Sequence, residues 1–252
     1  MGHESGRFMI VRKCKIPGAA LWLFLVVLPP FLSAEFTLKA DLVSSYIWRG
    51  FDLNPYERPV LQPSISTDLG DTGIALELWS SFSFENKELH EFDFTLSYQK
   101  RLGRHLEVVA GLIHYGWYFS PDFRFEDNTT HELFLSAALP GSIFSPGLVV
   151  FYDFHNGDGF YFLLQSDFEV ALLSRVGLQL YASLGYNAGQ WLAEAVDPGL
   201  SDLNLKMSIP ISLGDFRVVP YARYTFVLME AISREDYFLY GISVSFGWEG
   251  QE

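Results

Sequence analysis

Apolar and polar residues alternate along most of this chain after residue 35, and the apolar positions are rich in aromatic side chains. The segment 238–248 places large apolar side chains on one face of an extended chain and glycine or serine on the other. Segments 92–99 and 176–187 repeat the pattern. The alternation predicts an all-β protein, either a soluble sandwich with an apolar core or a membrane barrel with an apolar exterior.

The alternation, read together with the turn residues, predicts about twelve strands. They cover residues 36–50, 58–69, 73–84, 90–101, 105–119, 130–139, 147–156, 159–170, 175–187, 200–212, 215–228 and 236–248. Most reach the roughly 9 to 11 residues that a tilted membrane strand needs, whereas soluble strands average about five or six. Strand length therefore favours the barrel.

The predicted connections alternate between short and long, as in outer-membrane barrels with short periplasmic turns and longer external loops. The short ones are 70–72, 102–104, 173–175 and 213–214. The longer ones are 51–57, 85–89, 120–129, 188–200 and 229–235. Two links depart from the order, because 156–158 is short where an external loop is expected and 141–146 is long where a turn is expected.

The N-terminal segment predicts export. Basic residues between positions 7 and 15 precede an apolar stretch at 19–32, and Ser33-Ala34 suits signal-peptidase cleavage. We expect residues 1–34 to be a cleaved signal peptide, with Met9 as an alternative start, and residues 35–252 to form one barrel domain. A membrane anchor helix is the alternative, disfavoured because the stretch is shorter than about 20 residues.

The composition limits which partners and which structural classes are expected. The net charge is −13, and residues 1–34 hold more basic than acidic residues, so the remainder is more acidic still. Nucleic acid is therefore not an expected partner, because its phosphates attract basic surfaces. Cys14 is the only cysteine and lies in the predicted signal peptide, which excludes a disulfide framework. Since no run after residue 35 is long enough for a spanning helix, a spanning chain must be a closed barrel within outer-membrane lipid.

Aromatic residues gather near the predicted strand ends, where membrane barrels place interfacial girdles. Those assigned to the outer interface are Tyr46, Trp48, Phe82, Trp117, Tyr118, Phe154, Phe160, Tyr186 and Phe226. Those assigned to the periplasmic interface are Phe36, Tyr98, Phe168, Phe216, Phe246 and Trp248. Pro63, Pro210 and Pro220 fall within predicted strands, so we expect strand ends, bulges or kinks there.

If the apolar positions face lipid, the opposite positions face a lumen and are strongly polar. The lumen and selectivity candidates are Asp41, Arg49, Gln62, Glu77, Asp93, Glu132, Asp167, Arg217 and Arg223. They can select solutes by charge and size. Alternatively, the three arginines pair with Asp41, Glu77 or Asp93 and fill the barrel. About twelve strands lie between the eight that side chains fill and the sixteen that leave a wide channel, so both interpretations stay open.

The histidines are the candidates for other chemistry. A barrel hydrolase would need Ser, His and an orienting group, and His114 and His155 lack a recognisable nucleophile motif. A metal site from His90, His105, His114 and His131 is disfavoured, because their positions are expected to alternate between membrane sides. We therefore expect no enzyme activity, no cofactor and no metal.

The segment 44–51, followed by Pro59 to Ser64 and then Leu78 to Ser81, resembles the opening of the TorF-type porins of bacterial outer membranes. These share a serine, an aromatic and Arg-Gly on the first strand, Pro-x-x-Gln on the second and tryptophan then serine on the third. The match is specific over residues 40–82. The resemblance implies a barrel with a transport role and no catalytic residues. On the first strand, Arg49 would face the lumen near the outer mouth, across from Gln62.

We therefore predict a narrow outer-membrane channel for passive diffusion of small hydrophilic solutes, with a preference for cations or neutral molecules. The barrel assembly machinery is an expected partner, although four residues follow Trp248 where a terminal aromatic is usual. Two alternatives remain, a closed structural or adhesive barrel with binding loops such as 188–200, and a lipid-modifying barrel enzyme.

Overall fold

The computed structural model describes residues 35–53, 59–85, 87–117 and 129–248. The predicted signal peptide, residues 1–34, lies outside this part of the chain, as do Tyr118 and the side chain of Trp248. No helix among the described residues is long and apolar enough to cross a membrane.

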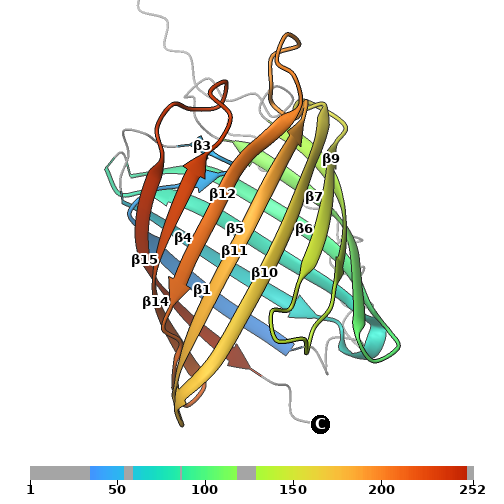
Figure 1. Cartoon of the computed structure of the whole chain (residues 1–252). Coiled ribbons are helices and arrows are strands. Elements are labelled where there is room, and N and C mark those ends of the chain that lie inside the picture. The colour runs from blue at the N-terminus through green and yellow to red at the C-terminus, as the bar shows by residue number, and fades with distance from the viewer. Residues whose placement is uncertain (1–34, 54–58, 86, 118–128, 249–252) are drawn as a thin grey trace, which may run out of the picture. The chain divides into compact units, whose positions relative to one another are not determined.

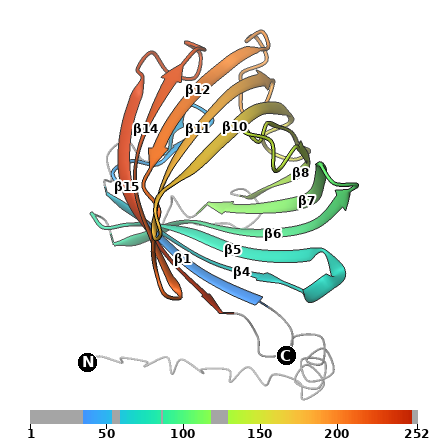
Figure 2. The same ribbon diagram turned by 60° about the horizontal axis from the view of Figure 1, so that its bottom comes forward.

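The strands form one antiparallel barrel that closes where the first strand pairs with the last (Figures 1 and 2). The wall strands are β1 (Glu35–Val43), β4 (Val60–Asp68), β5 (Ile74–Ser83), β6 (Glu88–Leu102), β7 (Leu106–Trp117), β8 (Thr129–Ala138), β9 (Gly147–Asp153), β10 (Gly159–Leu173), β11 (Val176–Ala188), β12 (Gly199–Ser208), β13 (Ile211–Leu213), β14 (Phe216–Val227) and β15 (Tyr237–Trp248). Because β12 and β13 both lie between β11 and β14, the barrel has 12 strands. The predicted all-β fold class is confirmed.

Large apolar side chains point outward and polar ones point into the barrel. On β8, Leu133 and Leu135 are 50% and 54% exposed, whereas Glu132, next to Leu133, is 0% exposed. The other wall strands show the same alternation, with buried Asp, Asn, Ser and Thr on the inner face of the barrel. An apolar exterior on a closed barrel suits acyl chains and not water, so the protein belongs in the bacterial outer membrane.

The connections include short turns as predicted, and the structure explains one of the two irregular links, residues 141–146. The short link after β4 is the 3-10 turn η2 (Gly70–Thr72), at the end of the barrel where β1 begins and β15 ends (Figure 1). The long link at residues 139–146 covers the part of β10 that the shorter β9 leaves unpaired. There the carbonyl of Phe144 accepts hydrogen bonds from Asp167 N at 3.0 Å and Ser166 Oγ at 2.7 Å.

The prolines behave in two ways. Pro210 lies in the break between β12 and β13, as expected of a residue that cannot donate to a ladder. Pro63 and Pro220 lie inside β4 and β14. Pro63 pairs with Ala40 of β1 and falls in a gap of the ladder with β5, between the pairs formed by Leu61 and Ser64.

The expected first strand over 36–50 is wrong after Val43. Ser44 makes the last contacts with β15, through Ser44 N to Tyr240 O at 2.9 Å and Tyr240 N to Ser44 Oγ at 3.0 Å. The chain then leaves the wall and forms a hairpin of β2 (Ile47–Trp48) and β3 (Phe51–Asp52).

Part of the predicted outer aromatic girdle is also wrong. Phe154, Phe160 and Tyr186 are 45%, 42% and 39% exposed, as girdle residues should be. Tyr46 instead packs on Trp79 of the inner face at 5.5 Å between ring centroids. Trp48 and Trp117 also lie inside the barrel, against Tyr115.

Candidate functional site

The β2–β3 hairpin carries the central residue of the lumen, Arg49. Its pairs, Ile47 with Asp52 and Trp48 with Phe51, leave a two-residue turn of Arg49 and Gly50. Both turn residues have positive φ, 51° and 88°, which is the conformation of the two-residue turns that suit a twisted hairpin. Glycine adopts it freely, whereas a non-glycine residue does so uncommonly, so Arg49 must be held there by its side-chain contacts.

Those contacts remove the Arg49 charge from water. Its Nη1 and Nη2 donate to Oε2 and Oε1 of Glu132 on β8 at 2.7 and 2.8 Å, a bidentate ion pair. The guanidinium carbon lies 4.2 to 4.5 Å from the ring centroids of Trp48, Phe151 and Tyr161. The two charged side chains are 7% and 0% exposed. The hairpin tip is therefore fixed by charge and by stacking at once.

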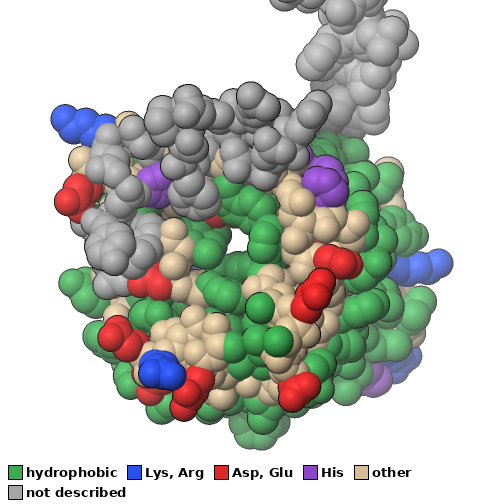
Figure 3. All heavy atoms as spheres, turned by 90° about the horizontal axis from the view of Figure 1, so that it is seen from above, with side chains coloured by type: hydrophobic (Ala, Val, Ile, Leu, Met, Phe, Trp, Pro, Cys, Tyr) green, Lys and Arg blue, Asp and Glu red, His purple; other side chains and the backbone are tan. Residues whose placement is uncertain are grey.

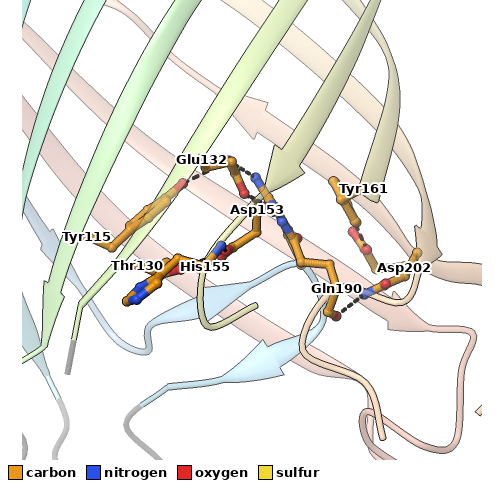
Figure 4. Close-up of polar contacts among 10 residues, drawn as sticks. Tyr115, Thr130, Glu132, Asp153, His155, Tyr161, Gln190 and Asp202 are labelled. Carbon is orange, nitrogen blue, oxygen red and sulfur yellow. Dashed lines mark hydrogen bonds and ion pairs between the residues drawn. The ribbon is translucent and has the colours of Figure 1, made fainter. Parts of the chain in front are cut away.

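Glu132 also collects hydrogen bonds from the wall and from an outer link (Figure 4). The hydroxyl of Tyr115 on β7 donates to its carboxylate at 3.1 Å, and Gln190 Nε2 donates at 2.6 Å. Gln190 lies in the link after β11, and its Oε1 accepts a further hydrogen bond from Arg49. One buried carboxylate thus ties together two wall strands, the hairpin and an outer link.

Two further acids anchor the same end of the barrel. Asp202 of β12 accepts hydrogen bonds from the hydroxyl of Tyr161 at 2.9 Å and from Asn204 Nδ2 at 2.7 Å. Asp153 of β9 accepts from Thr130 Oγ1 at 2.7 Å, and the backbone N of His155 donates to it at 3.0 Å. Figure 4 shows both acids at the same end of the barrel as Glu132. We call this end, with Glu132, Asp153, Asp202 and their partners, the mouth.

The base of the hairpin is held from the opposite wall. Arg223 of β14 donates from Nη2 to the carbonyl oxygen of Ile47 at 2.8 Å. A cavity of about 440 Å³ extends from Trp48 and Arg49 toward the middle of the barrel. Its other lining residues include Asp167, Gln179, Lys206 and Arg223. Charges of both signs therefore face one polar chamber beside the hairpin.

Most predicted lumen residues lie on the inner face of the wall. Asp41, Gln62, Glu77, Asp93, Glu132, Asp167, Arg217 and Arg223 all occupy the register positions opposite the exposed apolar side chains. Asp41 pairs in register with Gln62 and makes an ion pair with Lys39 at 2.7 Å. Asp167 accepts from Gln179 Nε2 at 2.9 Å. Their role in selectivity stays a prediction.

The expected position of Arg49 and the expected partners of the three arginines are wrong. Arg49 does not lie on the first strand across from Gln62, because the chain leaves the wall after Val43 and carries Arg49 to Glu132. The expected pairing of the arginines with Asp41, Glu77 or Asp93 gives way to other partners. Arg217 pairs with Glu169 at 3.5 Å, and Arg223 donates to a backbone carbonyl.

The sequence interpretation missed Tyr115, Tyr161 and Gln190 as partners of the buried acids, whereas Asp202 was expected to face the lumen. A signal existed for the two tyrosines, because they occupy inward positions of strands whose outward positions are already apolar. Gln190 has no such signal, since it lies in a link and meets Glu132 from 58 residues away.

The expectation that the histidines alternate between the two membrane sides is wrong for one pair. His114 near the end of β7 and His131 near the start of β8 are direct cross-strand neighbours at the same end of the barrel. Among the described residues, no group of three or more His, Cys, Asp or Glu is placed to hold a metal. His155 Nδ1 lies 3.0 Å from the carbonyl oxygen of Thr129.

Comparisons with solved structures identify the architecture. The KdgM porin superposes with a TM-score of 0.55 at 12% identity, covering 85% of this chain and 99% of that one. LpxR from Salmonella typhimurium gives 0.54 at 10% identity, with 84% and 99% covered. The COG4313 outer membrane channel from Pseudomonas putida F1 gives 0.51 at 10% identity, with 86% and 95% covered.

The chain has the outer-membrane β-barrel fold. No family model matches the sequence, and no curated protein matches it significantly. At these identities the structural likeness shows the fold alone, so the activity must be argued from the lumen itself.

Proposed function

We propose that this barrel is a narrow outer-membrane channel for passive diffusion of small hydrophilic solutes. The observation that carries the proposal is the polar cavity of about 440 Å³ beside the hairpin, lined by acids, bases and amides. A soluble core would not hold so many ionisable groups, because burying each one unpaired is costly. A hydrated interior holds them without that penalty. Two structural neighbours are described as a porin and a channel, which supports the same role.

The opening is narrow. Seen from above, the barrel shows a small gap near its centre, bordered mainly by hydrophobic side chains (Figure 3). The β2–β3 hairpin narrows the lumen, because Trp48, Arg49 and their partners pack inside the wall. We propose that the hairpin sets the size limit and that the chamber beside it sets the charge preference.

Acidic residues outnumber basic ones on the described inner face. The acids are Glu35, Asp41, Asp68, Glu77, Glu91, Asp93, Glu107, Glu132, Asp153, Asp167, Glu169 and Asp202. The bases are Lys39, Arg49, Arg101, Lys206, Arg217 and Arg223. An excess of acids along a hydrated passage with low-dielectric walls favours cations, so we propose cation preference.

Single-channel recording tests the proposal. The refolded protein, inserted into a planar lipid bilayer, should give discrete conductance steps in KCl. Under a salt gradient, the reversal potential should have the sign of a cation-selective pore. Anion selectivity would refute the charge preference, and an absence of conductance from a barrel that shows heat-modifiable migration would refute transport.

A closed structural or adhesive barrel is the second candidate, favoured by the dense mouth around Glu132. It predicts no conductance together with binding that depends on the loop at 188–200.

Membership of the TorF-type porins is part of the channel proposal and is supported by residues 40–82. Outer-membrane lipid and the barrel assembly machinery are proposed as partners on the same basis.

A further inference from the structure

His114 and His131 form a pair of imidazoles on the outside of the barrel. They are register partners on β7 and β8, and their Nδ1 atoms lie 3.2 Å apart. His131 shares the outward face of β8 with Leu133 and Leu135, which are two and four residues further along and exposed. The pair therefore lies on the membrane side of the wall and takes no part in the lumen.

The pair lies at the water-facing end of that side. β7 ends at Trp117, three residues beyond His114, and β8 begins at Thr129, two residues before His131. Phe154 stacks on His131 with 5.8 Å between ring centroids, at the level of the outer aromatic girdle. Ions from the external water can reach an interfacial position, whereas they cannot reach the middle of the apolar belt.

A third imidazole lies next to the pair. The ring centroid of His155 is 5.6 Å from that of His131. Its Nδ1 lies 3.0 Å from the carbonyl oxygen of Thr129, which can only accept, so Nδ1 carries a proton. Hydrogen bonds of this kind also orient metal-binding histidines, but His155 is not placed to share one ion with His114 and His131.

The separation of the two Nδ1 atoms suits a shared metal ion. Zinc binds imidazole nitrogen at about 2.0–2.1 Å, so two nitrogens at a tetrahedral angle lie roughly 3.3–3.4 Å apart. The observed 3.2 Å is close to this value. Imidazole prefers Zn²⁺, Cu²⁺ and Ni²⁺, whereas Mg²⁺ and Ca²⁺ prefer oxygen ligands.

We propose that His114 and His131 bind one divalent transition-metal ion of the zinc type through their Nδ1 atoms at the outer interface. The described side chains supply no third ligand in their present positions, so water completes the coordination sphere. Binding displaces the proton that lies between the two nitrogens, because each must present a lone pair to the metal. The ion then links β7 and β8 on the outside of the barrel, at the height where Arg49 and Glu132 link the inside.

Metal titration of the untagged, refolded protein in detergent tests the site. We expect one equivalent of Zn²⁺ by isothermal titration calorimetry, with at least about tenfold weaker binding in His114→Gln and in His131→Gln. His105→Gln is the matched control, because His105 is an exposed histidine in the link between β6 and β7, at the other end of β7, and should bind as the parent does. Each variant is first shown to be folded by heat-modifiable migration.

Spectroscopy of the unchanged protein gives an independent answer. Cu²⁺ bound at one equivalent should show electron paramagnetic resonance couplings from two imidazole nitrogens. An excess of Mg²⁺ should leave Zn²⁺ binding unchanged. The site is overturned if the parent protein does not bind Zn²⁺, if the two glutamine variants bind it as the parent does, if Cu²⁺ shows fewer than two nitrogens, or if Mg²⁺ competes equally.

Discussion

Two ion pairs inside the same barrel lie in opposite surroundings. Arg49 and Glu132 near the outer mouth are 7% and 0% exposed, bidentate, and surrounded by aromatic rings. Arg217 and Glu169 are 47% and 54% exposed and meet through one contact of 3.5 Å. The first pair joins the hairpin to the wall, and the second joins two hydrated surfaces.

The difference shows how one lumen can be both rigid and wet. A buried charge that loses its partner is strongly destabilising, whereas an exposed pair contributes about 0–1 kcal/mol. The mouth is therefore the part of the lumen where structure depends on side-chain chemistry. Toward the periplasmic end, where Arg217 and Glu169 are exposed, we expect side chains to be exchangeable with little effect on folding.

The largest expected effect comes from breaking the buried pair. Arg49→Met should destabilise the barrel by about 3–5 kcal/mol, because the carboxylate of Glu132 stays buried without its partner. The double variant Arg49→Met, Glu132→Met should recover most of that loss. Urea unfolding followed by tryptophan fluorescence measures both, and equal stability of the single and double variants would contradict a coupled pair.

A smaller effect is expected from a glycine that packs against the mouth. A Cβ on Gly185 would overlap the hydroxyl of Tyr161 and the carboxylate of Asp202. Gly185→Ala should therefore cost about 1–3 kcal/mol by overpacking. Gly147→Ala, on the periplasmic side, is the matched control, because its nearest neighbours would be at 3.4 Å, which is ordinary contact. The interpretation fails if both substitutions lower the unfolding midpoint equally.

The chamber beside the hairpin should control charge preference without controlling folding. Asp167→Asn should shift the reversal potential toward anions, and Lys206→Gln should shift it toward cations, because both residues line the same cavity with opposite charge. Both shifts should shrink as salt is raised from about 0.1 M to about 1 M, where the screening length falls from roughly 10 to 3 Å. Shifts of the same sign in the two variants would contradict a selectivity role.

The smallest effect is expected at the exposed pair. Arg217→Gln should change the free energy of unfolding by at most about 1 kcal/mol, because its partner Glu169 remains hydrated. The same urea unfolding experiment measures it. A loss as large as that of Arg49→Met would show that the two ends of the lumen do not differ as the exposures indicate.

The wall of the barrel could be predicted from local pattern. The expected strands over 175–187 and 236–248 correspond to β11 and β15, because alternation in phase with the pleat extends along both. The inward phase also placed Asp93, Glu132 and Asp167 on the correct face. Each of these inferences uses only neighbours along the chain.

The mouth could not be predicted in the same way. Residues 44–52 lose the strict alternation of β1, with Tyr46, Ile47 and Trp48 in a row, but nothing in them shows that the chain turns inward as a hairpin. The partners that decide between the two, Glu132 and Gln190, lie 83 and 141 residues further along the chain. The cross-strand contact of His114 with His131 likewise required the register of β7 and β8.

The sequence alone determined an all-β chain with long alternating strands, an apolar outer face and a polar inner face. Side-chain alternation follows from the two-residue repeat of an extended backbone, which is local. The tertiary structure decided which polar side chains meet, which of them leave water, and that Arg49 reaches the lumen on a hairpin and not on the wall. Those outcomes depend on register and on contacts between distant segments, whose free energy no single segment contains.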